Sequence, residues 1–256
     1  MRIYVLTQED PFYIPRLLDH LLEARRDVVG VGVVPGELQP GRFWRYLRLM
    51  GPRDFTLQFA NAGTHRALGF VGRAVPLGRS FSVSDAARRH GVPLDHVSKV
   101  NAPDFIQSLR TRSVELIVSV ACPQIFKKEI LSVPSKGAIN IHGSLLPDYQ
   151  GLLPSFWVLA RGENRTGVTV HFIDEHIDHG DIILQELVPI REDDTVHSLV
   201  LRSKIGVGKH LLVEAIARIE RGEVTRTRMD MSRARYFSFP DTEAVRRFRS
   251  ARRRFI

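Results

Sequence analysis

Three polar residues in this sequence have the types and the spacing of a site for acyl transfer. Asn140 and His142 lie two residues apart in the segment Asn-Ile-His-Gly-Ser-Leu-Leu-Pro, and Asp178 follows in a later polar segment. An amide can stabilise a developing oxyanion, an imidazole can polarise it or move a proton, and a carboxylate can orient the imidazole. No strong nucleophile motif surrounds them, so the pattern predicts direct transfer of an acyl group to an amine.

An Asn-x-His pair needs a β-strand to place both side chains on the same face, because strand side chains alternate. The apolar run 138–142 predicts such a strand. Ligands of open α/β sheets bind beyond the carboxyl ends of the strands, so we expect the pair to face a cleft there. The pair could instead satisfy buried backbone groups, and the residues around Asp178 could form an ordinary turn.

The rest of the chain alternates between β-branched apolar runs and segments of helical periodicity. Strands are predicted at residues 2–7, 28–34, 95–100, 114–120, 138–142, 168–173 and 182–189. Helices are predicted at residues 14–26, 105–112, 126–132 and 195–221, with another that begins after Ser82 or Ser84 and ends at His90. This rhythm predicts an α/β fold with a mostly parallel sheet.

Two segments depart from the rhythm. Residues 41–73 mix aromatic residues with arginines and glycines, which predicts one or two inserted amphipathic helices. This insertion could be a flap on the sheet, a dimer surface or substrate lid, or a membrane-surface contact. Residues 223–256 form a basic extension that ends in a helix, and its aromatic residues could pack on the core or stack on a nucleotide base.

Composition limits the class of protein. The chain has 256 residues, 43% of them hydrophobic, which suffices for one large domain with a small appendage. Ten arginines and three acidic residues lie in residues 226–256, so +7 of the net charge of +9 belongs to that segment. The nearly neutral remainder argues against a general nucleic-acid binder, although the tail could be a solvated or packing segment, or could bind RNA, a phosphorylated substrate or lipid head groups.

Compartment signals are sparse. One cysteine, Cys122, excludes an internal disulfide framework. The N-terminus lacks the layout of a signal peptide, and the longest apolar run is too short to span a bilayer. These features predict a cytoplasmic protein without a membrane span.

The extended pattern resembles a known family. Beyond the Asn-x-His-x-Ser-Leu-Leu-Pro segment it includes Gly151, Pro154, Trp157, Gly162, Gly167-Val168-Thr169 and Ile177-Asp178-His179-Gly180-Asp181. Residues 137–189 resemble the formyltransferases that use 10-formyltetrahydrofolate, among them methionyl-tRNA, glycinamide ribonucleotide and sugar N-formyltransferases. The resemblance implies a Rossmann-like open sheet with helices on both faces over a catalytic domain of residues 1–222, followed by the extension 223–256.

The resemblance also implies roles for the site residues. Asn140 and His142 would stabilise the tetrahedral oxyanion, and Asp178 would hold His142 and raise its pKa. A bound water or His142 itself would carry the proton to the leaving folate nitrogen. Two loops of the family hold the pterin through backbone groups. In this sequence they correspond to Val120, Ala121, Cys122, Gln124, Ile125, Ile173, Asp174 and His176. Cys122-Pro123 departs from the Tyr-Gly or similar pair of many members.

Metal binding is an alternative chemistry for the same region. His171, His176 and His179 lie among Asp174, Glu175, Asp178 and Asp181. The spacing of these residues matches neither an HExxH-like motif nor a regular helical site. We therefore predict no metal, with a metallohydrolase or a catalytically inert folate-binding protein as the remaining alternatives from other classes.

The acceptor amine is the least determined part of the prediction. Glycinamide ribonucleotide enzymes resemble one another in a Gly-rich phosphate loop after the first strand, whereas this chain has Thr7-Gln8-Glu9-Asp10-Pro11. Formyltetrahydrofolate hydrolases carry an N-terminal regulatory domain that is missing here, and residues 223–256 are too few for the tRNA-binding barrel of methionyl-tRNA enzymes. We expect a small amine, best a nucleotide-linked amino sugar, contacted by Gln8, Asp10, Phe12 and Ser144. A tRNA held by the basic tail is the runner-up, and a homodimer is left open.

Overall fold

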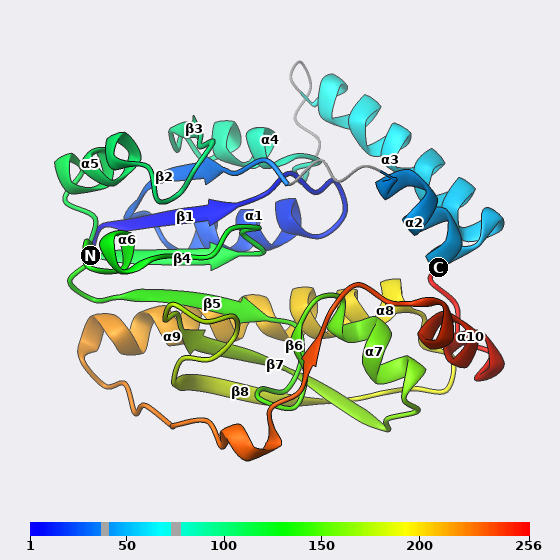
Figure 1. Cartoon of the computed structure of the whole chain (residues 1–256). Coiled ribbons are helices and arrows are strands. Elements are labelled where there is room, and N and C mark those ends of the chain that lie inside the picture. The colour runs from blue at the N-terminus through cyan, green and yellow to red at the C-terminus, as the bar shows by residue number, and fades with distance from the viewer. Residues whose placement is uncertain (37–40, 73–77) are drawn as a thin grey trace.

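A seven-stranded sheet of order β3-β2-β1-β4-β5-β7-β8 forms the centre of the molecule in a computed structural model, which describes residues 1–36, 41–72 and 78–256 (Figure 1). The strands are β1 (Ile3–Thr7), β2 (Val28–Val33), β3 (Leu94–His96), β4 (Leu116–Val120), β5 (Ala138–His142), β7 (Arg165–Phe172) and β8 (Ile182–Pro189). The first five pair in parallel, whereas β7 is antiparallel to both β5 and β8. The predicted open, mostly parallel sheet is confirmed.

Helices cover both faces of this sheet. They are α1 (Ile14–Ala24), α4 (Val83–Arg89), α5 (Pro103–Thr111), α6 (Lys128–Leu131) and α9 (Gly208–Arg221). Alternate residues of β1 point to opposite faces: Ile3 and Val5 join the core under α1, α4 and α9, whereas Tyr4 and Leu6 join the core under α5 and α6. This alternation explains why the central strands β1 and β4 are apolar at nearly every position.

A third apolar cluster joins parts of the chain that are distant in sequence. It contains residues of α2 (Arg42–Met50), α7 (Pro154–Ala160), α8 (Val196–Val200) and α10 (Thr242–Ser250). Phe156 of α7 stacks on Phe248 of α10 with ring centroids 4.8 Å apart. The C-terminal segment is thus packed against the α/β core, while the predicted domain boundary after Gly222 stays a prediction.

The insertion forms two helices, as predicted. These are α2 and α3 (Pro52–Val71), which project from the carboxyl end of the parallel strands (Figure 1). Residues 37–40 and 73–77, which include the last residue of the predicted insertion, lie outside the described residues. None of the helices described is both long and apolar enough to cross a membrane.

Two element predictions need correction. The strand expected at 95–100 is β3, which ends at His96 because its partner β2 ends at Val33. The continuous helix expected at 195–221 is interrupted by η1 (Leu201–Val207), a π-helical segment between α8 and α9. A Cβ on Gly206 would lie 3.3 Å from the carbonyl oxygen of Leu201, so glycine suits this widened turn.

Candidate active site

The pairing of β5 with β7 brings three polar side chains together. Asn140 is directly opposite His171, and His142 is opposite Thr169. Residues that are opposite one another share a face of the sheet, so His171 joins Asn140 and His142. The Nε2 atom of His171 lies 3.2 Å from the Nδ2 atom of Asn140. The predicted strand therefore presents the predicted pair on one face, with a second imidazole beside it.

Asp178 lies among these side chains in a left-handed backbone conformation, with φ of 49°. Its Oδ1 atom is 3.4 Å from Asn140 Nδ2 and 3.6 Å from His171 Nε2. Its Oδ2 atom accepts a 2.9 Å hydrogen bond from the Gly151 N–H and is 3.4 Å from His142 Nδ1. Asn140 and His142 thus both lie beside the Asp178 carboxylate. Non-glycine residues in a left-handed conformation cluster at functional sites.

Burial and charge oppose each other at this cluster. Burial alone would raise the pKa of the Asp178 carboxyl, but His142, His171 and the Gly151 N–H bring that pKa well below its usual range. Burial lowers the pKa of His142 below its ordinary 6.5, although the Asp178 carboxylate opposes this shift. The carboxylate of Asp178 thus acts on the pKa of His142 in the expected direction, but desolvation of the enclosed ring outweighs this attraction, so the net shift is downward.

The hydrogen bonds of His142 determine where it can take up a proton. Its Nε2 atom lies 2.7 Å from the carbonyl oxygen of Tyr149. A carbonyl only accepts, so Nε2 must carry the hydrogen and Nδ1 is the atom that gains or loses one. Because Nδ1 faces Asp178, proton uptake would create an ion pair. The geometry therefore suits His142 to accept a proton during a reaction.

The C-terminal segment holds the loop that follows β5. The strand β6 (Gln150–Gly151) pairs with β9 (Tyr236–Phe237), and the Gln150 N–H donates to the Arg235 carbonyl at 2.9 Å. The Phe237 ring stacks on Tyr149 with centroids 5.0 Å apart. Core packing, one of the two roles considered for the aromatic extension, is therefore found for Phe237. It fixes the Tyr149 carbonyl and the Gly151 amide that contact the trio.

Ser144 has a different place from the one expected. Its side chain is completely buried, and its hydroxyl donates a 2.9 Å hydrogen bond to the Tyr149 carbonyl. Its backbone carbonyl accepts a bond from the Thr169 hydroxyl. The predicted substrate contact is thus replaced by an internal one, because the hydroxyl helps to shape the loop and does not reach solvent.

Lys204 is a residue that the sequence interpretation missed. It lies in η1, and its methylene groups pack beside Gly143, the residue that follows His142. Burial lowers the pKa of the Lys204 ammonium, while the carboxylates of Asp10 and Asp178 raise it. The same positive charge contributes to lowering the pKa of His142. The π-helical turn places Lys204 beside the site. The sequence could not have predicted this position, because its pattern there is that of an ordinary helix.

The loop after β4 contains the first group of predicted folate-binding residues. Val120 is buried at the end of the strand, and Ala121 has a φ of 56°. Burial raises the pKa of the Cys122 thiol to about 11. The side chain of Gln124 spans the loop, with Oε1 accepting from the Val100 N–H at 2.9 Å. Strained backbone at this point favours a loop whose backbone groups bind a ligand.

The neighbouring residue Ile125 is 53% exposed, a large fraction for an apolar side chain. Ile177, on the loop that leads to Asp178, is 42% exposed. The first predicted folate loop therefore offers an apolar side chain to solvent, and the residue that follows the second loop offers another.

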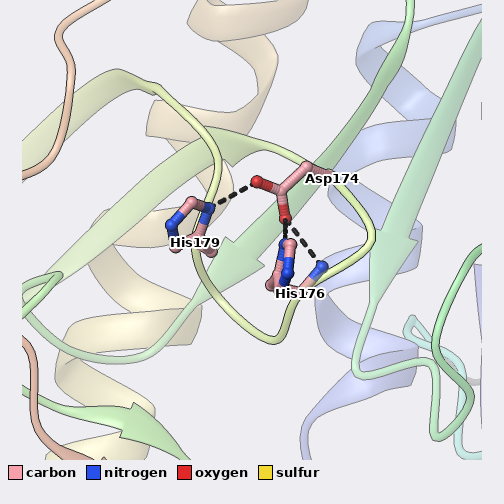
Figure 2. A group of neighbouring side chains, drawn as sticks. All are labelled: Asp174, His176 and His179. Atoms are coloured by element: carbon pink, nitrogen blue, oxygen red, sulfur yellow. Dashed lines mark hydrogen bonds and ion pairs between the residues drawn. The ribbon is translucent and has the colours of Figure 1, made fainter. Parts of the chain in front are cut away.

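Two residues of the second predicted folate loop, Asp174 and His176, form a compact group with His179, which follows that loop (Figure 2). One Asp174 oxygen accepts from the His176 N–H at 2.8 Å, and the other is 2.5 Å from His179 Nδ1. The preceding residue, Ile173, donates its N–H to the Ala138 carbonyl. The candidate ligand atoms of Asp174, His176 and His179 lie within 4.8 Å of one another, so these side chains could hold a transition metal.

The loop after β1 contains the predicted acceptor-binding residues. The Oδ1 atom of Asp10 accepts hydrogen bonds from the backbone N–H groups of Phe12, Tyr13 and Ile14 and thereby caps α1. The Phe12 ring packs against His65 of α3 at 5.3 Å. Gln8 is half-buried at the end of β1. One carboxylate oxygen of Asp10 is thus used within the fold.

A cavity of about 240 Å³ lies beside the second loop. Its lining includes Asp174, His179, Arg226 and Arg228. Asn140, His142 and Asp178 are not among the residues that line it. The cavity therefore does not contain the Asn140, His142 and Asp178 cluster.

The fold and the site define a Rossmann-like α/β protein with an Asn, His and Asp cluster. Solved structures of the same fold include an N-formyltransferase from Helicobacter canadensis in complex with folinic acid and dTDP-3-aminofucose. This enzyme is 20% identical to the present chain, with a TM-score of 0.60. The match covers 93% of the present chain and 71% of the enzyme. A glycinamide ribonucleotide transformylase from Symbiobacterium toebii is 22% identical to this chain, with a TM-score of 0.62. The match covers 90% of this chain and 94% of the transformylase.

Sequence comparison identifies the family. The formyl transferase family model matches residues 78–216, more than half of the 256 residues. This chain belongs to the formyl transferase family. Methionyl-tRNA formyltransferase of Citrifermentans bemidjiense is 39% identical over 148 residues, 58% of this chain and 46% of that protein. The methionyl-tRNA formyltransferase of Anaeromyxobacter sp. is 38% identical over 164 residues, which are 62% of this chain and 52% of that protein. The chain spans about half the length of these curated relatives.

Proposed function

We propose that this protein transfers a formyl group from 10-formyltetrahydrofolate to the primary amine of a small molecule, best a nucleotide-linked amino sugar. The convergence of Asn140, His142 and Asp178 on one buried cluster carries the proposal. Family membership supports formyl transfer. The folinic acid and amino-sugar nucleotide of one structural relative, and the dTDP and 5-N-formyl-THF of another, support the donor and acceptor classes.

The side chains divide the reaction between them. The amine nitrogen attacks the formyl carbon, and the Asn140 amide donates a hydrogen bond to the carbonyl oxygen as it becomes an oxyanion. His142 accepts the amine proton at Nδ1, where the Asp178 carboxylate stabilises the resulting cation. The proton then passes to the folate nitrogen as the carbon–nitrogen bond to the donor breaks. For His142 Nε2 to contact the oxyanion, the hydrogen bond between Nε2 and the Tyr149 carbonyl would have to break.

The donor would bind between the loop at Val120–Ile125 and the loop at Ile173–His176. Backbone groups near Ala121 and the exposed side chain of Ile125 support this location. The acceptor would approach from the Gln8–Phe12 loop, where the carboxylate of Asp10 interacts with Lys204.

A methionyl-tRNA acceptor is the second candidate, and the 39% identity to methionyl-tRNA formyltransferase favours it. The basic extension would supply phosphate contacts, which weaken steeply as salt concentration increases. A lack of tRNA binding at low salt would exclude this candidate.

A product assay tests the proposed function. The protein is incubated with 10-formyltetrahydrofolate and a panel of amino-sugar nucleotides, free amino sugars and methionyl-tRNA. We expect one amino-sugar nucleotide to gain the mass of one CO unit, and the His142→Ala variant to lose the activity while largely keeping folate binding. Unchanged turnover by His142→Ala would refute the mechanism. If methionyl-tRNA alone were formylated, the acceptor would be a tRNA and the proposed amino-sugar nucleotide would be wrong.

Metal removal provides a second prediction. No step above requires a metal ion, so treatment with a chelator followed by desalting is expected to leave the formylation rate unchanged. A loss of rate that Zn²⁺ restores in the wild type but not in a His176→Ala, His179→Ala variant would assign a catalytic metal to the group in Figure 2.

A further inference from the structure

The helical hairpin α2–α3 exposes an unusual amount of apolar surface. The described part of the chain has twelve exposed large hydrophobic side chains, and six of them lie in these two helices. They are Phe43, Trp44, Leu57, Phe59, Phe70 and Val71, with Phe59 and Phe70 each 72% exposed. Exposed apolar residues that gather in one element indicate an interaction surface more often than scattered ones do.

The outward side of α3 between these residues is weakly polar. Ala60, Gly63 and Ala67 are exposed there. The opposite side of the helix holds it in place, since Asp54 is buried and accepts hydrogen bonds from the backbone N–H groups of Phe255 and Ile256. The exposed side is therefore held in a fixed position and carries apolar residues together with Thr56 and Thr64, and the acidic residue of the hairpin is used inside the fold.

The remaining charge on the hairpin has one sign. Arg45, Arg48, Arg53 and Arg66 are exposed, and Asp54 is the single acidic residue in the sequence of α2 and α3. The basic helix α10 adjoins them, because Arg249 donates a hydrogen bond to the Arg48 carbonyl at 2.8 Å. Apolar and cationic side chains thus share one surface.

The hairpin also lies beside the proposed acceptor entrance. His65 Nδ1 is 2.6 Å from the carbonyl oxygen of Pro11, and the His65 ring contacts Phe12 and Phe81. Figure 1 shows α2 and α3 at the carboxyl end of the parallel strands. The inward side of the hairpin therefore packs against the Gln8–Phe12 loop, and its exposed side is left for another contact.

We propose that α2–α3 is an interfacial element that binds an anionic lipid surface. Such a surface offers hydrocarbon for the aromatic and aliphatic side chains and negative head groups for the arginines. A second copy of the chain would oppose like charges across a symmetric contact, and RNA would leave Leu57 and Val71 in water. The hairpin would lie on the bilayer, since no described helix can span it. The proposal does not depend on formyl transfer.

Vesicle binding by the whole chain tests the proposal. We expect sedimentation with vesicles of phosphatidylcholine and phosphatidylglycerol, and much weaker binding to phosphatidylcholine alone. Phe59→Ser together with Phe70→Ser should weaken binding at least about tenfold, from lost apolar burial. Leu187→Ser, 57% exposed on β8, is the matched control and should bind normally. Thermal melts verify that each variant is folded.

Fluorescence gives an independent measurement on the unaltered protein. Trp44 is 66% exposed, so its emission should shift to the blue on anionic vesicles and be quenched by brominated acyl chains. Absence of vesicle binding at low salt would overturn the proposal. So would binding that the two Phe substitutions do not change, a lipid-free dimer that they dissociate, or RNA binding that they abolish without any vesicle binding.

Discussion

Replacement of Asp178 by Asn is expected to lower kcat/KM for formyl transfer by about 10³–10⁴-fold. Both oxygens of Asp178 have two polar neighbours: the Gly151 N–H and His142 Nδ1 at Oδ2, and Asn140 Nδ2 and His171 Nε2 at Oδ1. An asparagine has one acceptor oxygen, so its NH₂ group must face one of these pairs. It also lacks the charge that stabilises protonated His142.

The pH dependence of the residual activity gives the same variant a second test. His142 must be neutral to accept a proton, so the rate should fall as pH decreases through its pKa, which burial sets below 6.5. The carboxylate of Asp178 raises this pKa, as does the hydrogen bond to the Tyr149 carbonyl. Its neutralisation should therefore move the acidic limb of kcat/KM to lower pH. The exposed Asp193→Asn serves as control, and a fully active Asp178→Asn enzyme would contradict the assigned role.

Replacement of Gly151 by Ala is expected to reduce both stability and activity. Gly151 has a φ of +94°, and a Cβ there would lie 2.3 Å from the Phe237 carbonyl oxygen. The strands β6 and β9 must separate to accommodate it, which should cost about 2–4 kcal/mol of unfolding free energy. The corresponding decrease in Tm is roughly 5–10 °C. Activity should fall further, because the Gly151 N–H also holds Asp178.

Gly162→Ala is the matched control for this substitution. Gly162 has a φ of +70°, but no heavy atom lies within 4 Å of a Cβ built there. It should cost about 1 kcal/mol for the left-handed conformation alone and leave kcat/KM unchanged. Thermal melts and product assays of both variants separate backbone strain from the clash with the C-terminal segment. Equal effects of the two substitutions would show that the β6–β9 contact is unimportant.

Local sequence predicts much of the catalytic cluster. The apolar run at 138–142 requires a buried strand, and strand alternation then places Asn140 and His142 on the same face. The cap at Ser82 is equally local, since its side chain accepts from the Asp85 N–H three residues later. These features depend on neighbours within a few residues, so residue types and spacing suffice to predict them.

Tertiary structure alone decides the environment of that cluster. The register of β5 with β7 places His171 beside Asn140, and the widened turn η1 brings Lys204 beside Gly143. Neither is visible in sequence, because register and π-helical turns depend on packing between distant segments. The net pKa of His142 likewise depends on burial, which a sequence pattern does not measure.

By itself, the sequence determined the α/β fold, the strand that carries Asn140 and His142, and the formyl transferase family. The tertiary structure decided that residues 235–237 hold the Tyr149 carbonyl and the Gly151 amide in place around His142 and Asp178. The physical reason is that these contacts use backbone groups, which every residue type carries. Only the folded chain shows which of them meet.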